Sequence, residues 1–441
     1  MAKNAKKTSW LSKFDFGPYW TWLIPAVALF IKIITVANTP NHIWPGSDAE
    51  SYLDGVNGLI KSGLFSDAEK LQYFPAGYPV FIWILSKVSL SNTLLLLSVS
   101  QSLIYAFASW YLIKKLNIGK LVKFTPWLAL LISFNPTLSL ASLVIGYESL
   151  VASLLMISVG ILLSIKKDLP NNWKIISLFS LVSTLASFLQ PRYLATSLIV
   201  IVFWLWKEFK FRNSKKYIAI SIVILLISPI FLGFRNSQAT GKFFVSNNLG
   251  VTMNVGAGPK SSGGYTNKAT GVECPKDVIT DNQKVICVLK WYATNPLQTV
   301  RLSFNKTLYF FSPWSGPLAN GTMARNPWLK INPVQQTAKT QDGFKMVYGG
   351  FGKTVSWIWF ISSFGTMIWG FIWLLRQKGE LQLIGQISGL VVGLSWLIAL
   401  GTIGDHRFRI PVMPFIFVLQ MAGLRGVSRK PLILKGQAKR R

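Results

Sequence analysis

Residues 21–37 read TWLIPAVALFIKIITVA, and residues 38–54, which follow directly, read NTPNHIWPGSDAESYLD. The first stretch is apolar and has nearly the length that a helix needs to cross a bilayer core of about 30 Å. The second stretch is polar and acidic. Because Thr39-Pro40-Asn41 is turn-like and offers no small-residue cleavage pattern, we expect an uncleaved first transmembrane helix rather than a signal peptide.

The composition of the whole chain agrees with this reading of its start. The 441 residues include 46 Lys+Arg against 15 Asp+Glu, a formal net charge of +31, yet charged residues make up only 14% and hydrophobic residues 51%. A soluble domain carries about 25% charged residues, which disfavours a soluble enzyme. A nucleic-acid binder would explain the charge but not a mean hydropathy of +0.40. We therefore expect an all-α polytopic membrane protein without a nucleic-acid partner.

Runs that are long and apolar enough, or nearly so, to form transmembrane helices recur along the chain. They are 21–37, 74–90, 93–113, 121–140, 143–165, 175–189, 193–206, 217–234, 354–375, 381–402 and 410–424. Basic loops follow many of them, and the positive-inside rule assigns such loops to the cytoplasmic side. The basic loops all fall on the cytoplasmic side only if the run 74–90 does not cross the membrane. We expect ten crossings with 74–90 as a re-entrant or interfacial helix; the alternative is an eleventh ordinary span.

The same topology divides the chain into three parts. Residues 1–234 form an N-terminal transmembrane core that includes the first external loop, 38–73. Residues 235–353 form a small external domain of helical and irregular structure, and 354–441 form the C-terminal helices and a basic cytoplasmic tail. Two cysteines, Cys274 and Cys287, bracket a short loop of the external domain. They are a disulfide candidate on this oxidising side, and two free buried thiols are the alternative.

Polar side chains at the helix ends collect on the external side in this topology. Carboxylates and arginines that converge at one membrane face usually mark a site, and the fork of an arginine suits phosphate oxygens. We therefore expect a carboxylate base beside a cationic cradle for a phosphate. The candidates are Asp48, Glu50, Tyr52, Tyr147, Glu148, Arg192, Asp405, His406, Arg407 and Arg409, with Lys32 in the outer half of the first span.

Each candidate also has a purely structural interpretation. Asp48 has the position of an N-cap for a helix over 49–62, and Glu148 that of a solvated carboxylate at a helix start. Arg407 and Arg409 have the spacing of a pair that extends to the interface from a membrane helix. No metal-ligand spacing occurs around the two histidines. We assign no metal ligand and no certain cofactor, although a divalent metal held by carboxylates such as Glu50 stays open.

Several of these stretches, in this order, resemble the GT-C superfamily of membrane glycosyltransferases. The nearest resemblance is to the clan of protein O-mannosyltransferases and aminoarabinose transferases. The stretches are SDAESY at 47–52, FPAGYPV at 74–80, NP at 135–136 with YESL at 147–150, Pro191, FVSNNLG at 244–250, NP at 295–296 with Lys306, and RFRIPVMP at 407–414. One departure is that Gln190 stands where the clan usually has an arginine before the proline.

The resemblance implies a GT-C-like bundle and a reaction. A sugar would pass from a polyprenyl-phosphate donor to an acceptor hydroxyl of a protein, lipid or cell-envelope glycan, with inversion at the anomeric carbon. Asp48 would be the general base, and Glu148 would orient the acceptor or an arginine. Arg407, Arg409, Arg192 and Lys32 would bind the donor phosphate, and Glu50, Tyr52, Tyr147, Asp405 and His406 would contact substrate.

Two rival functions remain open at this point. A polytopic transporter or lipid flippase would also have many spans and intramembrane charges, but transporters tend to place their sites at the midplane of repeated halves. A non-catalytic assembly subunit would keep the fold without the chemistry. For the enzyme we expect a multi-pass position in a bacterial cell (inner) membrane, surrounded by membrane lipids, with the active site on the extracytoplasmic face.

Overall fold

The computed structural model describes residues 19–46, 48–118, 121–164, 172–265, 271–275, 280–311, 341–342 and 349–427. Within these ranges the regular structure is helical, and extended pairing is limited to two isolated bridges, Trp44 with Val144 and Gly264 with Gly404. The expected all-α class is confirmed for this part of the chain. The Lys-rich N-terminus, the tail beyond 427 and residues 312–340 of the expected external domain lie outside it.

Six helices of the described chain are long and apolar enough to cross a membrane. They are α1 (Trp20–Ala37), α5 (Thr93–Leu116), the Lys215–Thr240 part of α10 (Tyr193–Thr240), α16 (Gly350–Leu375), α17 (Glu380–Gly401), and η6 (His406–Val412) continued by α18 (Met413–Val427). The pair Thr125–Phe134 and Thr137–Leu143, bent by 48°, makes a seventh if it is one span. These helices are those of a multi-pass membrane protein.

The expected span 121–140 is broken in its middle for a local reason. Helix α6 (Thr125–Phe134) ends before Pro136, which starts α7 (Pro136–Leu140), and η4 (Ala141–Leu143) follows. Proline cannot donate a backbone hydrogen bond, so the helix cannot continue through it unchanged. The Asn135 side chain instead caps α7 by accepting from the backbone N–H groups of Thr137 and Leu138, both at 3.0 Å.

Three shorter apolar helices lie within the bundle and correspond to expected spans. They are α8 (Glu148–Leu162), α9 (Asn172–Leu189) and the Tyr193–Lys207 part of α10. The expected run 143–165 is helical only from Glu148, because an irregular segment precedes it. Almost every residue of α8 is buried, so this helix occupies the centre of the core. Serines within it, such as Ser153, satisfy their hydroxyls by donating to the preceding turn.

Helix α10 reverses direction between its two parts. Its start is joined to the end of α9, because the Tyr193 amide donates to the Gln190 carbonyl at 3.1 Å. Its far part returns to the same place, since the Phe231 and Phe188 rings lie 5.7 Å apart. A straight helix would separate residues 193 and 231 by roughly 57 Å. The basic stretch 207–216 is therefore at the turn of a helical hairpin, as the sequence pattern of two runs predicts.

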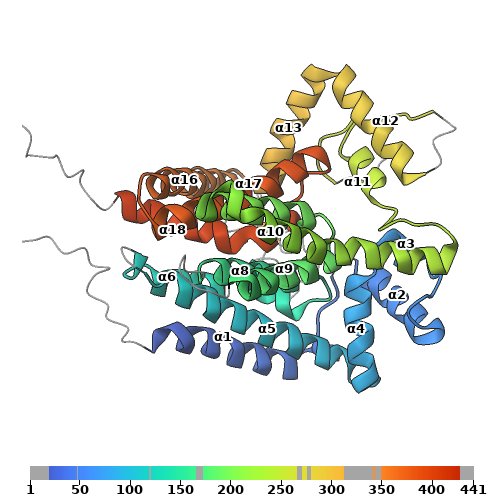
Figure 1. The fold of residues 1–441 in the computed structure, drawn as a ribbon, viewed down its shortest axis with the longest axis horizontal. Helices are drawn as coiled ribbons and strands as arrows, with labels where there is room; N and C mark the ends of the chain where they lie inside the picture. The colour runs from blue at the N-terminus through green and yellow to red at the C-terminus, as the bar shows by residue number, and fades with distance from the viewer. Residues whose placement is uncertain are drawn as a thin grey trace, which may run out of the picture.

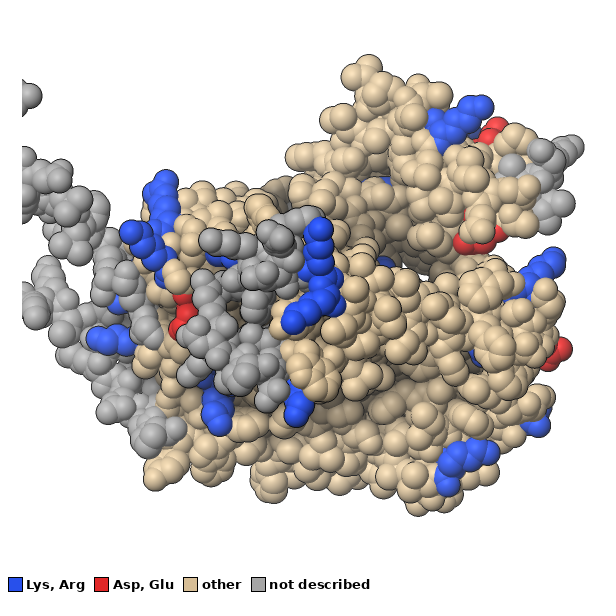
Figure 2. Space-filling view, in the orientation of Figure 1, with Lys and Arg blue, Asp and Glu red and all other residues tan. Residues whose placement is uncertain are grey.

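The helices of the bundle run in a common direction, and the remaining elements gather at one end (Figure 1). We call this the loop end; it holds α2 (Ala49–Ser62), α3 (Glu69–Tyr73), α4 (Gly77–Val88), α11 (Leu249–Val255), α12 (Asp281–Thr294) and α13 (Pro296–Phe311). The start of α1 and the end of α18 lie at the opposite, terminal end. Figure 2 shows Lys and Arg side chains near the terminal end and also at several places on the loop end.

The segment 74–90 forms α4, a helix of 12 residues. At 1.5 Å per residue it is about 18 Å long, which is too short for a bilayer core. Figure 1 shows α4 running across the direction of α1 and α5. Pro79 lies in its first turn, where a missing N–H costs nothing.

Small residues allow the closest approaches between helices. A Cβ atom added to Gly370 of α16 would lie 1.7 Å from the Leu419 carbonyl oxygen of α18, and one added to Gly423 would lie 2.0 Å from that of Thr366. The two helix backbones therefore touch at a pair of glycines, as is common where membrane helices associate. This contact fixes α18, and with it η6, against the bundle.

The end of α10 is bonded to the turn that follows α2. Arg235 is completely buried, and its guanidinium donates to the carbonyls of Leu64 (3.1 Å) and Ser66 in the turn after α2. Its neighbour Asn236 donates to the Phe244 carbonyl at 2.8 Å. One helix end therefore holds both the turn after α2 and the segment that leads to α11. We call residues 249–311 the α11–α13 lobe, as far as they are described.

The α11–α13 lobe is stabilised by a cap, a disulfide and a small apolar core. Thr280 and Gln283 form a reciprocal capping box at the start of α12. Cys274 and Cys287 are joined by a disulfide, beside a cluster that includes Met253 and Val288. The surface between this lobe and the bundle is hollowed (Figure 2).

Candidate functional site

Two loops at the loop end are joined by backbone hydrogen bonds. The Trp44 amide donates to the Leu143 carbonyl at 2.9 Å, and the Ile145 amide donates to the Trp44 carbonyl at 3.0 Å. Gly46 lies so close to this pairing that an added Cβ would be 2.4 Å from the Ile145 oxygen. The bridge brings the start of α2, with Asp48, beside the start of α8, with Glu148.

A buried tyrosine and glutamine support the second of these loops. The Tyr78 hydroxyl accepts from the Gly146 amide at 2.8 Å and donates to the Gln101 side-chain oxygen at 3.1 Å. The Gln101 amide donates in turn to the carbonyls of Ser142 (3.1 Å) and Val144 (3.0 Å). Tyr78 and Gln101 were not among the expected site residues. The signal for Gln101 is a glutamine inside an apolar run, and Tyr78 lies in the FPAGYPV stretch.

Arg407 joins the two carboxylates that the loops bring together. Its Nη1 donates to the Asp48 carboxylate at 2.5 Å, and its Nε donates to the Glu148 carboxylate. Its guanidinium also lies 5.5 Å from the centre of the Tyr147 ring. Because an arginine fork can engage two acceptors at once, Arg407 holds α2, α8 and η6 in one arrangement. We call Asp48, Tyr147, Glu148, Arg192 and Arg407 the Arg407 cluster.

The segment that carries Arg407 is capped by its own sequence. Asp405 is the N-cap of η6, and its carboxylate accepts from the Arg407 backbone N–H at 2.8 Å. The same carboxylate lies 3.1 Å from Nδ1 of the largely buried His406. Both residues were expected to contact substrate. In the structure they shape the turn that presents Arg407.

Exposure distinguishes the two carboxylates of the cluster. The Asp48 side chain is 31% exposed, the Arg407 side chain 18% and the Glu148 side chain only 6%. A molecule arriving from the loop end can therefore reach Asp48 and the outer edge of Arg407 but not Glu148. Glu148 has the position of a fixed counter-charge, and Asp48 that of an exchangeable one.

Tyr147 connects the cluster to a second arginine. Its hydroxyl accepts from Arg192 Nη2 at 2.5 Å and from the Gln190 side chain at 3.2 Å. The Arg192 guanidinium also lies 4.0 Å from the centre of the Phe408 ring. Among the described residues no carboxylate forms an ion pair with Arg192. The site therefore contains a cation whose charge is not balanced by a partner in direct contact.

Tyr52 is a buried aromatic residue of α2 that packs near the Arg407 cluster. It is 2% exposed, and its ring packs edge-on against Phe74 (5.3 Å) and Tyr78 (5.0 Å). Burial, as the largest influence, raises the pKa of its phenol well above the usual value, against the opposing effect of Arg407. Tyr52 therefore stays neutral and cannot act as a proton acceptor at physiological pH.

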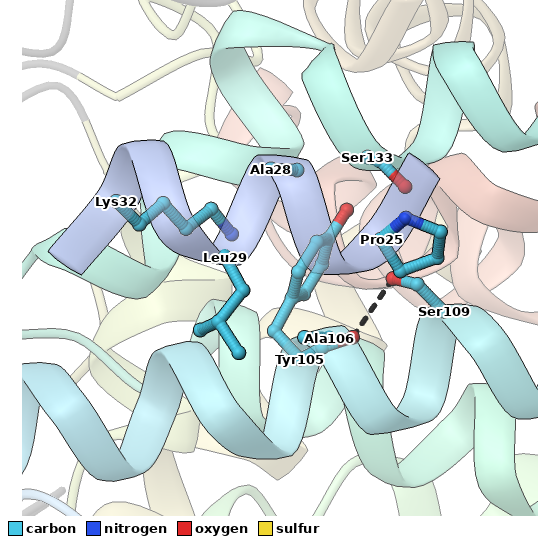
Figure 3. Close-up of a pocket in the computed structure, with 8 residues that line it drawn as sticks. All are labelled: Pro25, Ala28, Leu29, Lys32, Tyr105, Ala106, Ser109 and Ser133. Carbon is cyan, nitrogen blue, oxygen red and sulfur yellow. Dashed lines mark hydrogen bonds between the residues drawn. The ribbon is translucent and has the colours of Figure 1, made fainter. Parts of the chain in front are cut away.

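Three expected site residues are not brought to the Arg407 cluster. Glu50 is exposed on the surface of α2. Arg409 extends the other way and donates from Nη1 to the Phe311 carbonyl at the end of α13. Lys32 lies inside the bundle, 4% exposed, with its Nζ 4.0 Å from the centre of the Tyr105 ring. Figure 3 shows it in a small space between α1, α5 and α6, lined also by Ser109 and Ser133.

The described part of the chain contains no group of three or more His, Cys, Asp or Glu side chains that is arranged to hold a metal ion. Comparison with known proteins adds no assignment. No family model, no curated protein and no solved structure matches this chain.

Proposed function

We propose that the protein is an integral membrane glycosyltransferase of the GT-C type. It would transfer a sugar from a polyprenyl-phosphate donor to an acceptor hydroxyl at the outer face of a cell membrane, with inversion. The observation that supports this most directly is Arg407, which is shared between an accessible carboxylate and a buried one at the loop end of a membrane bundle. The motifs that resemble the GT-C clan include the residues that meet there.

The proposed topology has ten crossings. Seven correspond to the candidate spans, counting the bent pair as one, and three to α8, α9 and the first part of α10, with α4 along the outer interface. An even number of crossings leaves both ends of the chain on one side. This fits the position of α1 and α18 at the terminal end and of the α11–α13 lobe at the other (Figure 1). Residues 235–353 would then be the external domain.

In the proposed reaction Asp48 is the general base. The acceptor hydroxyl attacks the anomeric carbon, its proton passes to the Asp48 carboxylate, and the bond from that carbon to the phosphate oxygen breaks. The electron pair leaves with the polyprenyl phosphate, which gains a negative charge. No strong acid is required, because phosphate is already a stable leaving group. Asp48 is preferred over Glu148 as the base because it is the carboxylate that solvent reaches.

Arg407 and Arg192 would stabilise the charge that develops on the phosphate. Arg407 turns its outer edge from Asp48 to the phosphate, which frees Asp48 to accept the proton, while Glu148 keeps the guanidinium in position. Arg192 contributes a second positive charge through its place beside Tyr147. Fixed cations aimed at developing charge are among the strongest catalytic effects in a site protected from water.

The test compares two carboxylates of the same helix turn. We expect Asp48→Asn, in membranes supplied with polyprenyl-phosphate sugars, to lower transfer by about 10²–10⁴-fold, the usual worth of a general base. Glu50→Gln is the matched control, because Glu50 is exposed on α2 and no hydrogen bond or ion pair among the described residues joins its side chain to the cluster. Full transfer by Asp48→Asn would remove this residue from the mechanism. If no such donor supports transfer by the unmodified protein, the enzyme proposal itself fails.

A second measurement identifies the substrates. Deleting the gene and comparing the glycans and lipids of the cell envelope would reveal which sugar and which acceptor are lost. Restoring the loss with the unmodified protein but not with Asp48→Asn would connect the product to the Arg407 cluster. If a lipid accumulates on one face of the membrane and no glycosidic linkage is lost, a flippase is the better description.

A further inference from the structure

Helix α13 holds the segment that carries Arg407 on both sides. Before Arg407, the Lys306 side chain of α13 donates to the carbonyls of Leu400 and Thr402, at 2.8 and 2.7 Å. After it, Arg409 donates to the carbonyl of Phe311, the last residue of α13. A segment of eight residues, 402–409, is thus fastened at each end to the same helix.

Lys306 is saturated by these contacts. It is completely buried, and its third donor goes to the Tyr292 hydroxyl of α12 at 2.7 Å. An ammonium group has three protons, so each is used and none remains for a substrate. The two carbonyls belong to the end of α17, whose last C=O groups lack partners within the helix. We call Lys306, Tyr292 and these two carbonyls the Lys306 clasp.

The backbone beside the clasp leaves little freedom for the segment to shift. The Gly404 amide donates to the Gly263 carbonyl at 2.9 Å. A Cβ on Gly404 would lie 2.6 Å from the Cα of Lys306, so the segment rests directly on α13. Gly263 has a φ of +84°, which only glycine adopts readily. The hydrogen bond from Trp396 Nε1 to Thr307 Oγ1, at 3.0 Å, anchors α13 to α17 next to these contacts.

We propose that Lys306 and Arg409 are positioning residues, which set the place of Arg407 without contacting the substrate. This inference rests on the proposed function, because it assumes that Arg407 binds the donor phosphate. It gives the α11–α13 lobe a role in the reaction: the lobe supplies one wall of the turn that presents the cation. It also reassigns Arg409, whose donor points at a backbone carbonyl and not into the Arg407 cluster.

The experiment measures donor affinity and turnover separately in purified protein in lipid nanodiscs. For Lys306→Met we expect kcat/KM for the polyprenyl-phosphate sugar to fall about tenfold, through a higher KM and a lower kcat, because a misplaced Arg407 holds both the donor phosphate and its developing charge less well. Lys306→Arg, which keeps charge and donors, should recover most of the affinity. Lys290→Met is the matched control, because Lys290 is an exposed lysine of the neighbouring helix α12. Arg409→Gln should act in the same direction as Lys306→Met.

A double-mutant cycle separates positioning from a general loss of stability. If Lys306 acts through Arg407, adding Lys306→Met to Arg407→Lys should weaken binding of a polyprenyl phosphate by less than about twofold further. Additive losses, or a Lys306→Met protein with unchanged KM, would overturn the inference. If Lys306→Met does not fold, Lys306→Arg and Arg409→Gln carry the test.

The outcome also distinguishes this inference from the proposed function. If the unmodified protein does not bind a polyprenyl phosphate, or if Arg407→Lys binds it equally well, the proposed function fails. If Arg407→Lys weakens binding and the Lys306 and Arg409 variants do not, only the positioning role fails.

Discussion

Arg407 and Lys306 are cations withdrawn from water at the same end of the bundle, and they differ in what neutralises them. Arg407 contacts two carboxylates, Asp48 and Glu148. Lys306 contacts a phenol and two helix-end carbonyls. A phosphate can take the place of a carboxylate beside Arg407 with little change in charge. A phosphate that displaced a carbonyl from Lys306 would leave that carbonyl without a hydrogen-bond donor. The Arg407 cluster is therefore suited to exchange its partner, and the Lys306 clasp is suited to stay closed.

The largest expected effect tests the exchangeable side of this comparison. Arg407→Lys keeps the positive charge but loses the planar fork that reaches both carboxylates. We expect kcat/KM for transfer to fall by about 10²–10³-fold, the range for loss of one group that stabilises developing charge. Steady-state kinetics with a defined polyprenyl-phosphate sugar provide the measurement. Activity within about threefold of the unmodified protein, a change of less than about 1 kcal/mol in transition-state stabilisation, would show that a point charge suffices.

A smaller effect is expected at the buried carboxylate. Glu148→Gln removes the fixed charge that holds Arg407 Nε but keeps the size of the side chain, so the guanidinium keeps its place less firmly. We expect kcat/KM to fall by about tenfold or more, less than for Arg407→Lys. Equal or larger loss than for Asp48→Asn would contradict the assignment of Asp48 as the base, because it would give Glu148 the greater share in the chemistry.

The Arg407 cluster was largely predictable because its members stand at the ends of apolar runs. Parity of the crossings and the positive-inside rule assign those ends to one side, and the two loops and η6 then bring Asp48, Glu148 and Arg407 together. The breaks before α7 and α8 were not predicted, because hydropathy does not distinguish a kinked run from a straight one. The cap at Asn135-Pro136 shows that the local signal for the first break was present.

The supporting contacts could not be predicted from the sequence. Tyr78 with Gln101 and the Lys306 clasp join elements that lie far apart in the chain, and no periodic pattern reports which carbonyl a side chain will reach. Arg409 was expected to bind the donor phosphate with Arg407 because both belong to the RFRIPVMP stretch that resembles the GT-C clan. In the tight turn of η6 they extend to different partners, a carboxylate pair and the Phe311 carbonyl.

The second cation of the site offers a finer test. Arg192 has no carboxylate in direct contact within the described structure and donates to Tyr147 at 2.5 Å. We expect Arg192→Gln to raise the KM for the donor about fivefold, since one of two charges near the phosphate is lost and each is worth roughly 1 kcal/mol at a partly exposed position. Tyr147→Phe should produce a similar change if the hydroxyl positions Arg192. Binding of a polyprenyl phosphate, measured at two salt concentrations, checks that the loss is electrostatic.

The contacts of Lys306 predict that the KM for the donor depends weakly on pH. Burial lowers the pKa of Lys306 to about 7, and Tyr292, whose own pKa is raised to about 12, is the titratable group in direct contact with it. Below pH 7 the ammonium donates to three acceptors; above it the neutral amine has two protons, and one contact is lost. We expect the KM for the donor to rise about twofold between pH 6 and pH 8, the size of one weak hydrogen bond.

The matched variant for this dependence is Lys306→Arg, which stays charged over the whole range and should give a flat profile. If the KM for the donor rises between pH 6 and pH 8 in Lys306→Arg as much as in the unmodified protein, the titrating group is not Lys306. The lowered pKa of Lys306 also makes the stability of the folded protein depend on pH. Because the folded pKa lies below the unfolded value, the folded protein binds fewer protons between about pH 7 and 10, so this group makes the protein more stable as pH rises through that window.

Lys32 is another buried cation, and among the described residues neither a carboxylate nor a helix-end carbonyl is its partner. Its ammonium lies over the Tyr105 ring inside the bundle, away from the Arg407 cluster. Replacing a buried charge that lacks a carboxylate by an apolar side chain of similar length removes a desolvation cost. We expect Lys32→Met to leave the KM for the donor within about twofold and to raise the thermal unfolding midpoint by about 2 °C. A large rise in the KM would instead indicate that Lys32 binds the donor phosphate. A cation without a carboxylate partner could then bind substrate as Arg407 is proposed to do.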